Sequence, residues 1–272
     1  MIWENIQKSV TYIQSKTDFT PEVSITLGSG LGHFVNAVET VCSIDYKDIP
    51  GFFPPSVEGH GGRLVLGQLG NKKVALLQGR VHYYEGHSMQ EVVHPTRVVG
   101  QLGASTMIIT NSAGGLKKEI EPGTFMILRD LVNMTGENPL RGPNIEQLGV
   151  RFPDMSEPFD KELSDRLEGV LKDKKVPYFN GVYFGVQGPT YETAAEVRLY
   201  GSVMGGGAVG MSTVPEVIAA KHMGKKVVGI SCITNLGTGL SNEVLTHDDV
   251  KAVASRVETQ FSDFLAEFVK GL

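Results

Sequence analysis

Several short segments of this chain combine glycine with side chains that bind anions, and each follows a run of apolar residues. The first is GSGLG (28 to 32), whose backbone amides and Ser29 hydroxyl suit a small anion. A dinucleotide-binding fingerprint needs glycine at position 33, where this chain has His33, and a P-loop needs Gly-Lys-Ser/Thr after the turn. The spacing therefore favours a tight anion-binding turn, and an ordinary strand-to-helix turn stays the alternative.

The segment QGRVHYYEGH (78 to 87) brings arginine, histidine and glutamate close together. In a strand, Arg80 and His82 project to the same side and together offer donors to an oxyanion such as phosphate. Glu85 is spaced to fix the tautomer of His82 and to favour its charged form. A metal site at His82 and His87 is the weaker interpretation, because neither HExxH nor a carboxylate cluster accompanies them. A solvated polar loop stays a further alternative.

Two later segments could complete an anion site and bind a flat base. The backbone amides of TNSAGG (110 to 115) could close the other side of an anion cradle, and its small side chains let a ligand approach closely. In GPTYET (188 to 193), Tyr191 can stack on a ring and Glu192 can accept hydrogen bonds from ring N–H groups. Glu192 equally suits the plain role of an acidic residue at a helix N-terminus.

Near the C-terminal end, VGMSTVPE (209 to 216) predicts a strand end followed by a helix with proline in its first turn. Asn235 ends a further strand, and its amide carries both a donor and an acceptor for the edge of a heterocycle. His247 stands at the expected start of the last helix, where the positive end of the helix dipole favours the neutral imidazole.

These segments need strands and helices that bring them together. β-branched runs bounded by Gly, Pro or Asn predict strands at 23–27, 73–78, 106–110, 124–128, 181–186 and 226–231. An apolar stripe predicts a helix over 2–13, capping boxes at 88–91 and 193–196 begin further helices, and a last helix runs from near Thr246 to Phe268. The alternation indicates an α/β fold, with a mixed, mainly parallel central β-sheet flanked by helices on both faces, in a single domain over 1–272.

The composition excludes several classes of protein. An apolar share of 41% and a charged share of 20% predict a packed core rather than disorder. The net charge of −5 gives no basic surface for nucleic acid. Cys42 and Cys232 are too far apart for CxxC chemistry, so we expect neither a disulfide nor a thiolate metal site. With no signal peptide and no long apolar run, a cytoplasmic protein without membrane contact is expected.

Taken in order, the segments resemble the trimeric purine nucleoside phosphorylases, a family that includes methylthioadenosine phosphorylase, from about residue 20 to the C-terminus. Besides the segments above, the resemblance rests on NPLRGPN (138 to 144), RFPDMS (151 to 156) and ITN (233 to 235). It implies a phosphorylase/hydrolase-like fold, a homotrimer, and a pentosyltransferase of purine salvage. The implied reaction is the reversible phosphorolysis of inosine, guanosine and their deoxy forms to free base and (deoxy)ribose 1-phosphate. Inorganic phosphate is the co-substrate, with no cofactor and no metal.

The resemblance also implies roles for individual side chains. Catalysis would fall to His82, Glu192 and Asn235. Phosphate would be bound by Ser29, Arg80, His82, Asn111, Ser112 and Ser212, with Glu85 supporting His82. The ribose would contact Tyr84, Met211 and His247. The purine would contact Tyr191, Glu192, Val209 and Asn235, with Thr234 supporting Asn235. Phe152 would reach into the site of a neighbouring subunit.

Some features distinguish this chain within that family or leave other functions open. Asparagine at 235 resembles the 6-oxopurine type, because the methylthioadenosine branch has aspartate there; a methylthioadenosine-type phosphorylase stays the alternative. The stretch Gly205-Gly206-Gly207 stands where Gly-Ala-Asp is common, and it could loosen the strand that leads to Met211. A phosphate-independent nucleoside hydrolase usually needs an aspartate-rich calcium site, which the sequence lacks. A non-catalytic nucleoside-binding protein would keep the pocket without turnover.

Overall fold

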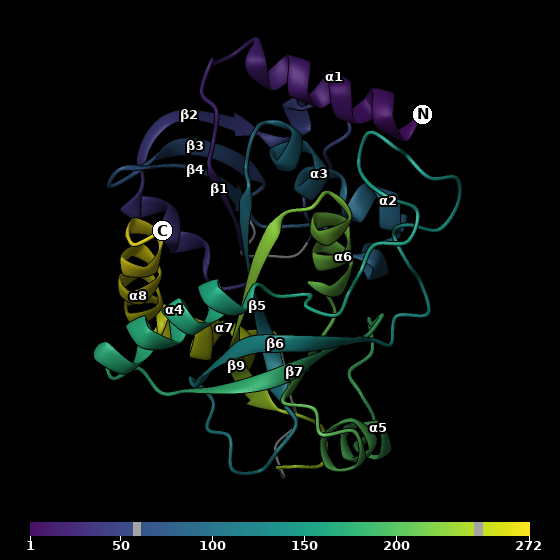
Figure 1. Cartoon of the computed structure of the whole chain (residues 1–272). Helices are drawn as coiled ribbons and strands as arrows, with labels where there is room; N and C mark the ends of the chain where they lie inside the picture. The colour runs from purple at the N-terminus through teal and green to yellow at the C-terminus, as the bar shows by residue number, and fades with distance from the viewer. Residues whose placement is uncertain (57–60, 242–246) are drawn as a thin grey trace.

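The structure is a computed structural model that describes residues 1–56, 61–241 and 247–272, without the side chain of His247. Its helices are α1 (Ile2–Gln14), α2 (Met89–Val92), α3 (His94–Gln101), α4 (Lys161–Asp173), α5 (Ala194–Arg198), α6 (Val214–His222), α7 (His247–Arg256) and α8 (Glu258–Lys270) (Figure 1). Its strands are β1 (Val23–Leu27), β2 (Glu39–Asp45), β3 (Arg63–Leu69), β4 (Lys72–Gln78), β5 (Thr106–Gly115), β6 (Phe125–Asn133), β7 (Tyr178–Gly185), β8 (Ala208–Gly210) and β9 (Lys226–Leu236).

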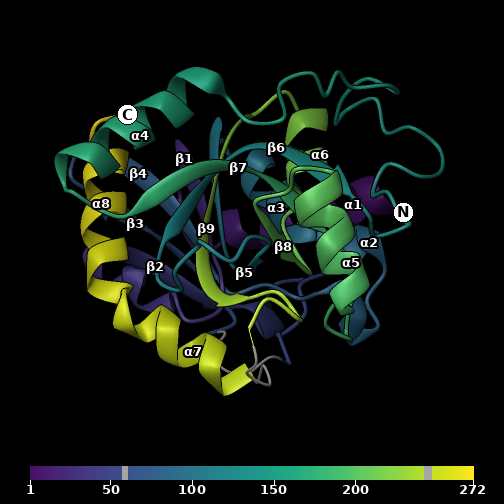
Figure 2. The ribbon, with the colours of Figure 1, turned by 90° about the horizontal axis from the view of Figure 1, so that it is seen from below.

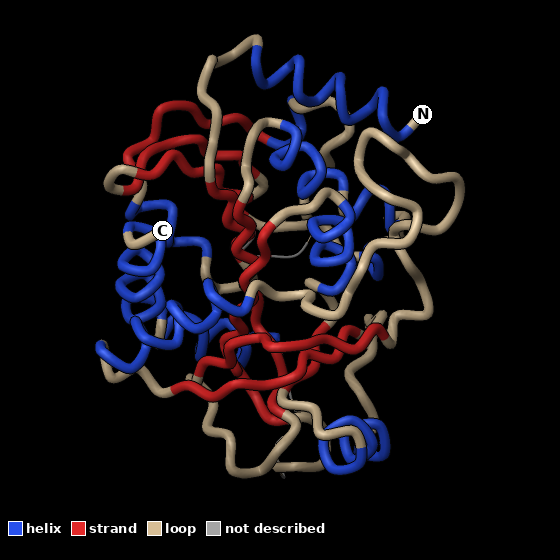
Figure 3. The backbone as a smooth tube through the Cα atoms, in the orientation of Figure 1, coloured by secondary structure: helices blue, strands red, loops and turns tan. Residues whose placement is uncertain are grey.

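The strands form one mixed sheet in the order β2-β3-β4-β1-β5-β8-β7-β6-β9. Parallel pairings join β1 to β4 and β5, β5 to β9, and β7 to β6 and β8. Because β5 pairs with β9 as well as β8, the strands β5, β8, β7, β6 and β9 close into a ring, and β2, β3, β4 and β1 extend from it. Figure 3 shows these strands running through the middle of the molecule.

Helices cover both faces of the sheet, as the sequence predicts, and the α/β fold class is confirmed. Figures 1 and 2 show α1, α3 and α6 on one side and α4, α7 and α8 on the other. Along β5, Met107 and Ile109 join the buried cluster beneath α1, α3 and α6, whereas Ile108 joins the cluster beneath α4 and α8. This alternation follows from the two-residue period of a strand whose two faces are both buried.

The predicted elements differ from the observed ones mainly at their ends. Strand β5 continues to Gly115, and the polar residues that ended the apolar run, such as Asn111 and Ser112, still pair with β9. The single predicted last helix is two helices, α7 and α8, with a break at Val257; Thr246 lies outside the described residues. Strands β2 and β3 and helix α4 were not predicted. None of the described helices is long and apolar enough to cross a membrane.

In the stretch Gly205-Gly206-Gly207, which leads into β8, Gly206 and Gly207 are buried and closely packed, whereas Gly205 is exposed. A Cβ atom on Gly207 would come within 2.6 Å of the Met126 sulfur. The Gly207 amide donates to the Val182 carbonyl at 3.0 Å, and its own carbonyl accepts from the Leu116 amide at 3.1 Å. Hydrogen bonds on both sides and contact with a buried side chain argue against the loosening that the sequence suggested.

Candidate active site

One cavity of about 370 Å³ collects nearly all of the side chains that the sequence singled out. It lies at the carboxyl ends of β1 and β4 and along the second halves of β5 and β9. The carboxyl ends of parallel strands are the usual ligand position in such sheets. The predicted residues that line it are Ser29, Arg80, His82, Tyr84, Asn111, Ser112, Tyr191, Glu192, Val209, Met211, Ser212, Thr234 and Asn235. The structure therefore brings these residues together, while their individual roles stay predictions.

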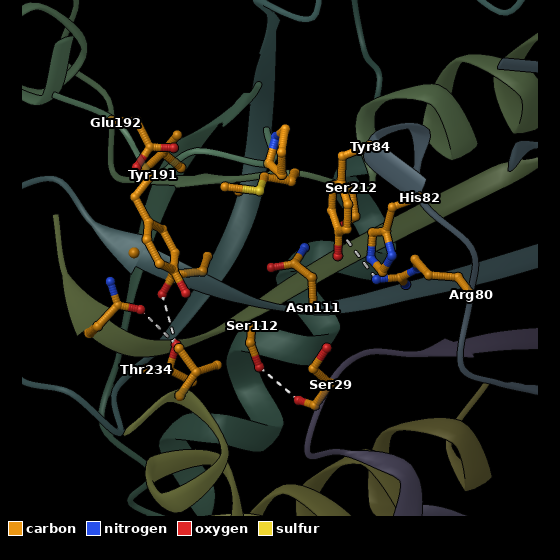
Figure 4. Close-up of a pocket in the computed structure, with 18 residues that line it drawn as sticks. Ser29, Arg80, His82, Tyr84, Asn111, Ser112, Tyr191, Glu192, Ser212 and Thr234 are labelled. Atoms are coloured by element: carbon orange, nitrogen blue, oxygen red, sulfur yellow. Dashed lines mark hydrogen bonds between the residues drawn. The ribbon is translucent and has the colours of Figure 1, made fainter. Parts of the chain in front are cut away.

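The cavity has two chemically different ends (Figure 4). One end, called the anion end below, holds Arg80, His82, Tyr84 and Ser212. The other, called the base end, holds Tyr191 and Glu192. Asn111 and Ser112, from the second half of β5, lie between the two groups, and Thr234 lies below Tyr191. A ligand that fills this cavity meets cationic and hydroxyl groups at one end and an aromatic ring with a carboxylate at the other.

Arg80 is held at the anion end by partners from three different segments. The side chain is only 6% exposed. Its Nη2 donates to the Thr110 carbonyl at 2.7 Å, its Nη1 to the Ser212 hydroxyl at 3.4 Å, and its Nε to Oε1 of Glu216 at 3.2 Å. These bonds fix the plane of the guanidinium, and that plane decides how an oxyanion can be gripped.

Sequence reasoning missed Glu216, although a signal for it was present. Thr213 and Glu216 form a Thr-x-x-Glu capping box at the start of α6, the same pattern that the sequence shows at Thr193 and at Ser88. It also missed Val250, which lines the cavity from α7, and the small residues Gly114 and Gly210. An alanine-sized side chain at Gly114 would come within 3.1 Å of the Asn235 amide nitrogen.

Glu85 fixes the His82 ring as predicted, and burial also acts on the charge of that ring. The Nδ1 atom of His82 lies 2.9 Å from Oε1 of Glu85, which also accepts the His82 backbone amide at 2.7 Å. The Tyr84 ring stacks on the imidazole with centroids 4.8 Å apart. Burial lowers the pKa of His82 and outweighs the opposing hydrogen bond from Glu85. Glu85 thus favours the charged form as predicted, but burial, which the sequence does not show, shifts the balance toward the neutral ring.

Glu85 itself sits behind His82 rather than in the lining of the cavity. Its Oε2 accepts the backbone amide of Ser56 at 2.8 Å and is also bonded by the Ser56 hydroxyl. Burial alone raises the pKa of Glu85, but the hydrogen bonds from His82 and Ser56 lower it to about 2. The carboxylate is thus charged near pH 7, and it links Ser56 to the anion end of the cavity.

Asn235 and Glu192 give the other end its hydrogen-bonding character. The Thr234 hydroxyl donates to Oδ1 of Asn235 at 3.0 Å, and Nδ2 of Asn235 donates to the Leu236 carbonyl at 3.1 Å, so the amide has a fixed orientation. Burial, together with the nearby charge of Glu196, raises the pKa of Glu192. Tyr191 remains 42% exposed, so this end of the cavity is open to a flat ligand.

Between the two ends, β5 and the turn after β1 are tied together. The Ser112 hydroxyl donates to the Ser29 carbonyl at 2.8 Å. Nδ2 of Asn111 donates to the Thr213 hydroxyl at 2.8 Å, while its Oδ1 is buried without a hydrogen-bond partner among the described residues. This lining surface is therefore rigid.

Besides Glu85, two of the predicted site residues lie outside this cavity or outside the description. Phe152 is 86% exposed, with the Arg151 guanidinium 5.4 Å from its ring centroid, and does not line the cavity of its own chain. His247 is the first residue of α7, but its side chain falls outside the described residues. Over the described residues, no group of three or more His, Cys, Asp or Glu is arranged to hold a metal ion.

Comparisons with known proteins show the family to which the chain belongs. A sequence profile of the phosphorylase superfamily matches residues 22–270. The chain is 46% identical to purine nucleoside phosphorylase 1 of Geobacillus stearothermophilus, over 98% of this chain and 97% of that protein. Two crystal structures of Schistosoma mansoni purine nucleoside phosphorylase, one with adenosine and one with inosine, each match this chain with a TM-score of 0.93 at 36% identity. Each match covers 99% of this chain; it covers 97% of the chain in the adenosine complex and 96% of the chain in the inosine complex.

The superfamily profile matches most of the chain, and the alignment with the Geobacillus stearothermophilus protein covers 98% of it. The chain therefore belongs to the phosphorylase superfamily, as the resemblance implied.

The low pKa of Glu85 predicts how stability depends on pH. Because its folded-state pKa is about 2 against an ordinary 4.5, the carboxylate stabilises the fold above pH 4.5, and this contribution is lost as the pH falls toward 2. We expect Glu85→Gln to lower the Tm at pH 7 by about 3 to 8 °C, as for one or two charge-assisted hydrogen bonds. The difference in Tm between the unaltered protein and Glu85→Gln should become smaller below pH 4.5 in thermal melts. A difference in Tm that stays constant from pH 7 to pH 2.5 would contradict the low pKa of Glu85.

Proposed function

We propose that this protein is a purine nucleoside phosphorylase that catalyses the reversible phosphorolysis of inosine, guanosine and their deoxy forms. The observation that carries the proposal is the single cavity with Arg80 and His82 at one end and Glu192 and Asn235 at the other. The names of the relatives support the same reaction. We further propose that residues 1–272 act as one domain, in cytoplasmic purine salvage, with inorganic phosphate as the only co-substrate.

In the proposed reaction, a phosphate oxygen forms a bond to C1′ of the ribose while the C1′–N9 bond breaks. The electron pair of that bond passes into the purine, and the transition state resembles a ribosyl cation. The protein must hold an anion close to the developing positive charge and stabilise negative charge on the departing base. The phosphate ligands are Ser29, Arg80, His82, Asn111, Ser112 and Ser212. Tyr84, Met211 and His247 contact the ribose.

His82 suits one particular form of phosphate. A neutral imidazole that donates Nδ1–H to Glu85 has no proton on Nε2, so this nitrogen accepts a hydrogen bond. Monohydrogen phosphate carries a single O–H group that can be donated to it. Arg80 supplies donors for the remaining oxygens, so that the two side chains together recognise one protonation state of the anion.

At the base end, Asn235 and Glu192 recognise a 6-oxopurine. With one Nδ2 hydrogen on the Leu236 carbonyl, the second hydrogen is assigned to the purine edge at N7 and O6, where negative charge develops. Glu192 accepts N1–H, and Tyr191 and Val209 contact the ring faces. Losing one such contact should raise the barrier by about 2 to 4 kcal/mol, by analogy with oxyanion-hole donors.

Phosphate dependence is the central test of this function. We expect the purified protein to release hypoxanthine from inosine only when phosphate is present, with ribose 1-phosphate as the second product. Assays of base release with and without phosphate, on a panel of inosine, guanosine, adenosine and methylthioadenosine, would measure this. Equal release without phosphate would indicate a hydrolase, no release with any nucleoside would indicate a binding protein, and a preference for methylthioadenosine would indicate the other branch of the family.

Substrate choice is proposed to depend on Asn235, because its oriented amide can donate to the O6 atom of a 6-oxopurine. An aspartate accepts from a 6-amino group but offers no donor to O6. We expect Asn235→Asp to shift the ratio of kcat/KM for inosine over adenosine by about 10- to 100-fold toward adenosine. The control Asn180→Asp, on β7 outside the cavity, should leave this ratio unchanged. An unchanged ratio in Asn235→Asp would remove this residue from base recognition.

We propose that the active assembly is a homotrimer in which Phe152 contributes to the site of a neighbouring subunit. A phenylalanine that is 86% exposed on one chain is stabilised when a second chain buries it. We expect Phe152→Ala and Asn235→Ala to be impaired as separate proteins, because each lacks one part of every site. Co-expressed mixtures should exceed the summed activity of the two, since a subunit with Asn235 then receives Phe152 from its neighbour. Strictly additive activity would refute the shared site.

A further inference from the structure

Glu216 is a buried carboxylate directly behind the anion end of the cavity. It lies in the first turn of α6 and is only 3% exposed. Both of its oxygens are engaged: Oε1 accepts from Nε of Arg80 at 3.2 Å, and Oε2 accepts from the backbone amide of Thr213 at 3.1 Å. A carboxylate in this environment is stable only when its charge is paired and its lone pairs are satisfied, and this arrangement meets both conditions.

The first contact of Glu216 fixes the direction of the Arg80 side chain. Arginine is always charged, and its guanidinium offers Nε on one edge and Nη1 and Nη2 on the others. Because Glu216 holds Nε and the Thr110 carbonyl holds Nη2, rotation of the group about its long stem is prevented. The Nη1 edge then lies toward Ser212, at the wall of the cavity.

The second contact holds the turn that carries Ser212. Thr213 has a φ of +70°, a backbone conformation that β-branched residues rarely adopt. Its amide is held by Glu216, and its hydroxyl accepts from Asn111 at 2.8 Å and lies 3.1 Å from the Ser212 hydroxyl. One carboxylate therefore connects the guanidinium to the turn, and through the turn to Asn111 on β5.

From this geometry we propose that Glu216 is a positioning residue for phosphate. It sets the relative placement of Arg80 and Ser212 without touching the anion itself. The inference rests on the proposed phosphorolysis and adds a residue to its phosphate-binding apparatus. Its distinctive consequence is that loss of Glu216 weakens the use of phosphate, and not the recognition of the purine.

A plain capping role is the competing explanation, and the chain offers a matched control for it. Glu91 closes a Ser-x-x-Glu box at the start of α2, where its Oε2 accepts the Ser88 backbone amide at 2.7 Å. That contact is exposed, and the other described partners of the Glu91 carboxylate are the Ser88 hydroxyl at 2.8 Å and the nearby charge of His87. Glu91→Gln therefore removes a capping carboxylate without removing a partner of Arg80.

The test compares Glu216→Gln and Glu91→Gln with the unaltered protein in steady-state kinetics. Glutamine can still accept from Arg80, but its NH2 group cannot accept the Thr213 amide, and the negative charge is lost. We expect Glu216→Gln to raise the KM for phosphate by about 10- to 100-fold and the KM for inosine by less than about twofold. In Glu91→Gln both values should stay as in the unaltered protein.

Two further measurements separate positioning from general damage to the fold. Because Glu216 acts through Arg80 as well as through the Thr213 turn, in an Arg80→Ala background the change Glu216→Gln should raise the phosphate KM by a smaller factor than it does in the unaltered protein. Inorganic phosphate alone should raise the Tm of the unaltered protein more than that of Glu216→Gln, because the variant binds phosphate more weakly. This measurement reports phosphate binding without turnover. Should Glu216→Gln fold poorly, Glu216→Asp keeps the charge but withdraws it by one methylene group, and it should also raise the KM for phosphate selectively.

The outcomes distinguish this inference from the proposed function. A normal phosphate KM in Glu216→Gln and Glu216→Asp, with phosphate-dependent turnover intact, overturns the positioning role alone. Equal increases in the KM for phosphate and for inosine also overturn it, because a general loss of structure would affect both substrates. If the unaltered protein neither uses phosphate nor gains Tm from it, the proposed function and the inference both fall.

Discussion

The structure of the site depends on the buried positive charge of Arg80. A guanidinium that is only 6% exposed needs acceptors around it, and the fold provides the Thr110 carbonyl from β5 and the Glu216 carboxylate from α6. These acceptors come from segments that are distant in sequence, so the arginine ties the interior strand β5 to a helix on the face of the sheet. The cation that is proposed to bind an oxyanion is thus also a structural cross-link.

Strand β5 makes this arrangement possible, because it pairs with β1, β8 and β9 and so joins the extended strands to the closed ring. Its first half is apolar and buried between the two helix layers, and its second half carries Asn111 and Ser112 along the cavity. Because β5 keeps its backbone hydrogen bonds where its residues change from apolar to polar, the polar side chains along the cavity are held by the sheet.

The sequence predicted the strands that position the site, because apolar runs bounded by Gly, Pro or Asn mark buried strands. The predicted strand ended at Thr110 because the residues that follow in β5 are polar and line the cavity, so they do not continue the apolar run. Strand β2 was not predicted, because its residues are largely exposed. The pairing of His82 with Glu85 follows from local spacing, so it was predictable. The pairing of Arg80 with Glu216 was not, because it joins residues 136 positions apart, and neither was the neutral state of His82, which depends on burial.

The two ends of the cavity differ in rigidity, and this difference fits the demands of the proposed reaction. At the anion end, Arg80 and Thr213 are buried and cross-linked, whereas at the base end Tyr191 is 42% exposed. In the proposed reaction, attack on C1′ requires a precisely placed oxyanion, and the cross-linked end is the one that meets this requirement. A flat base tolerates more freedom, and in the proposed reaction its identity is read by Asn235, whose amide has a fixed orientation, together with Glu192.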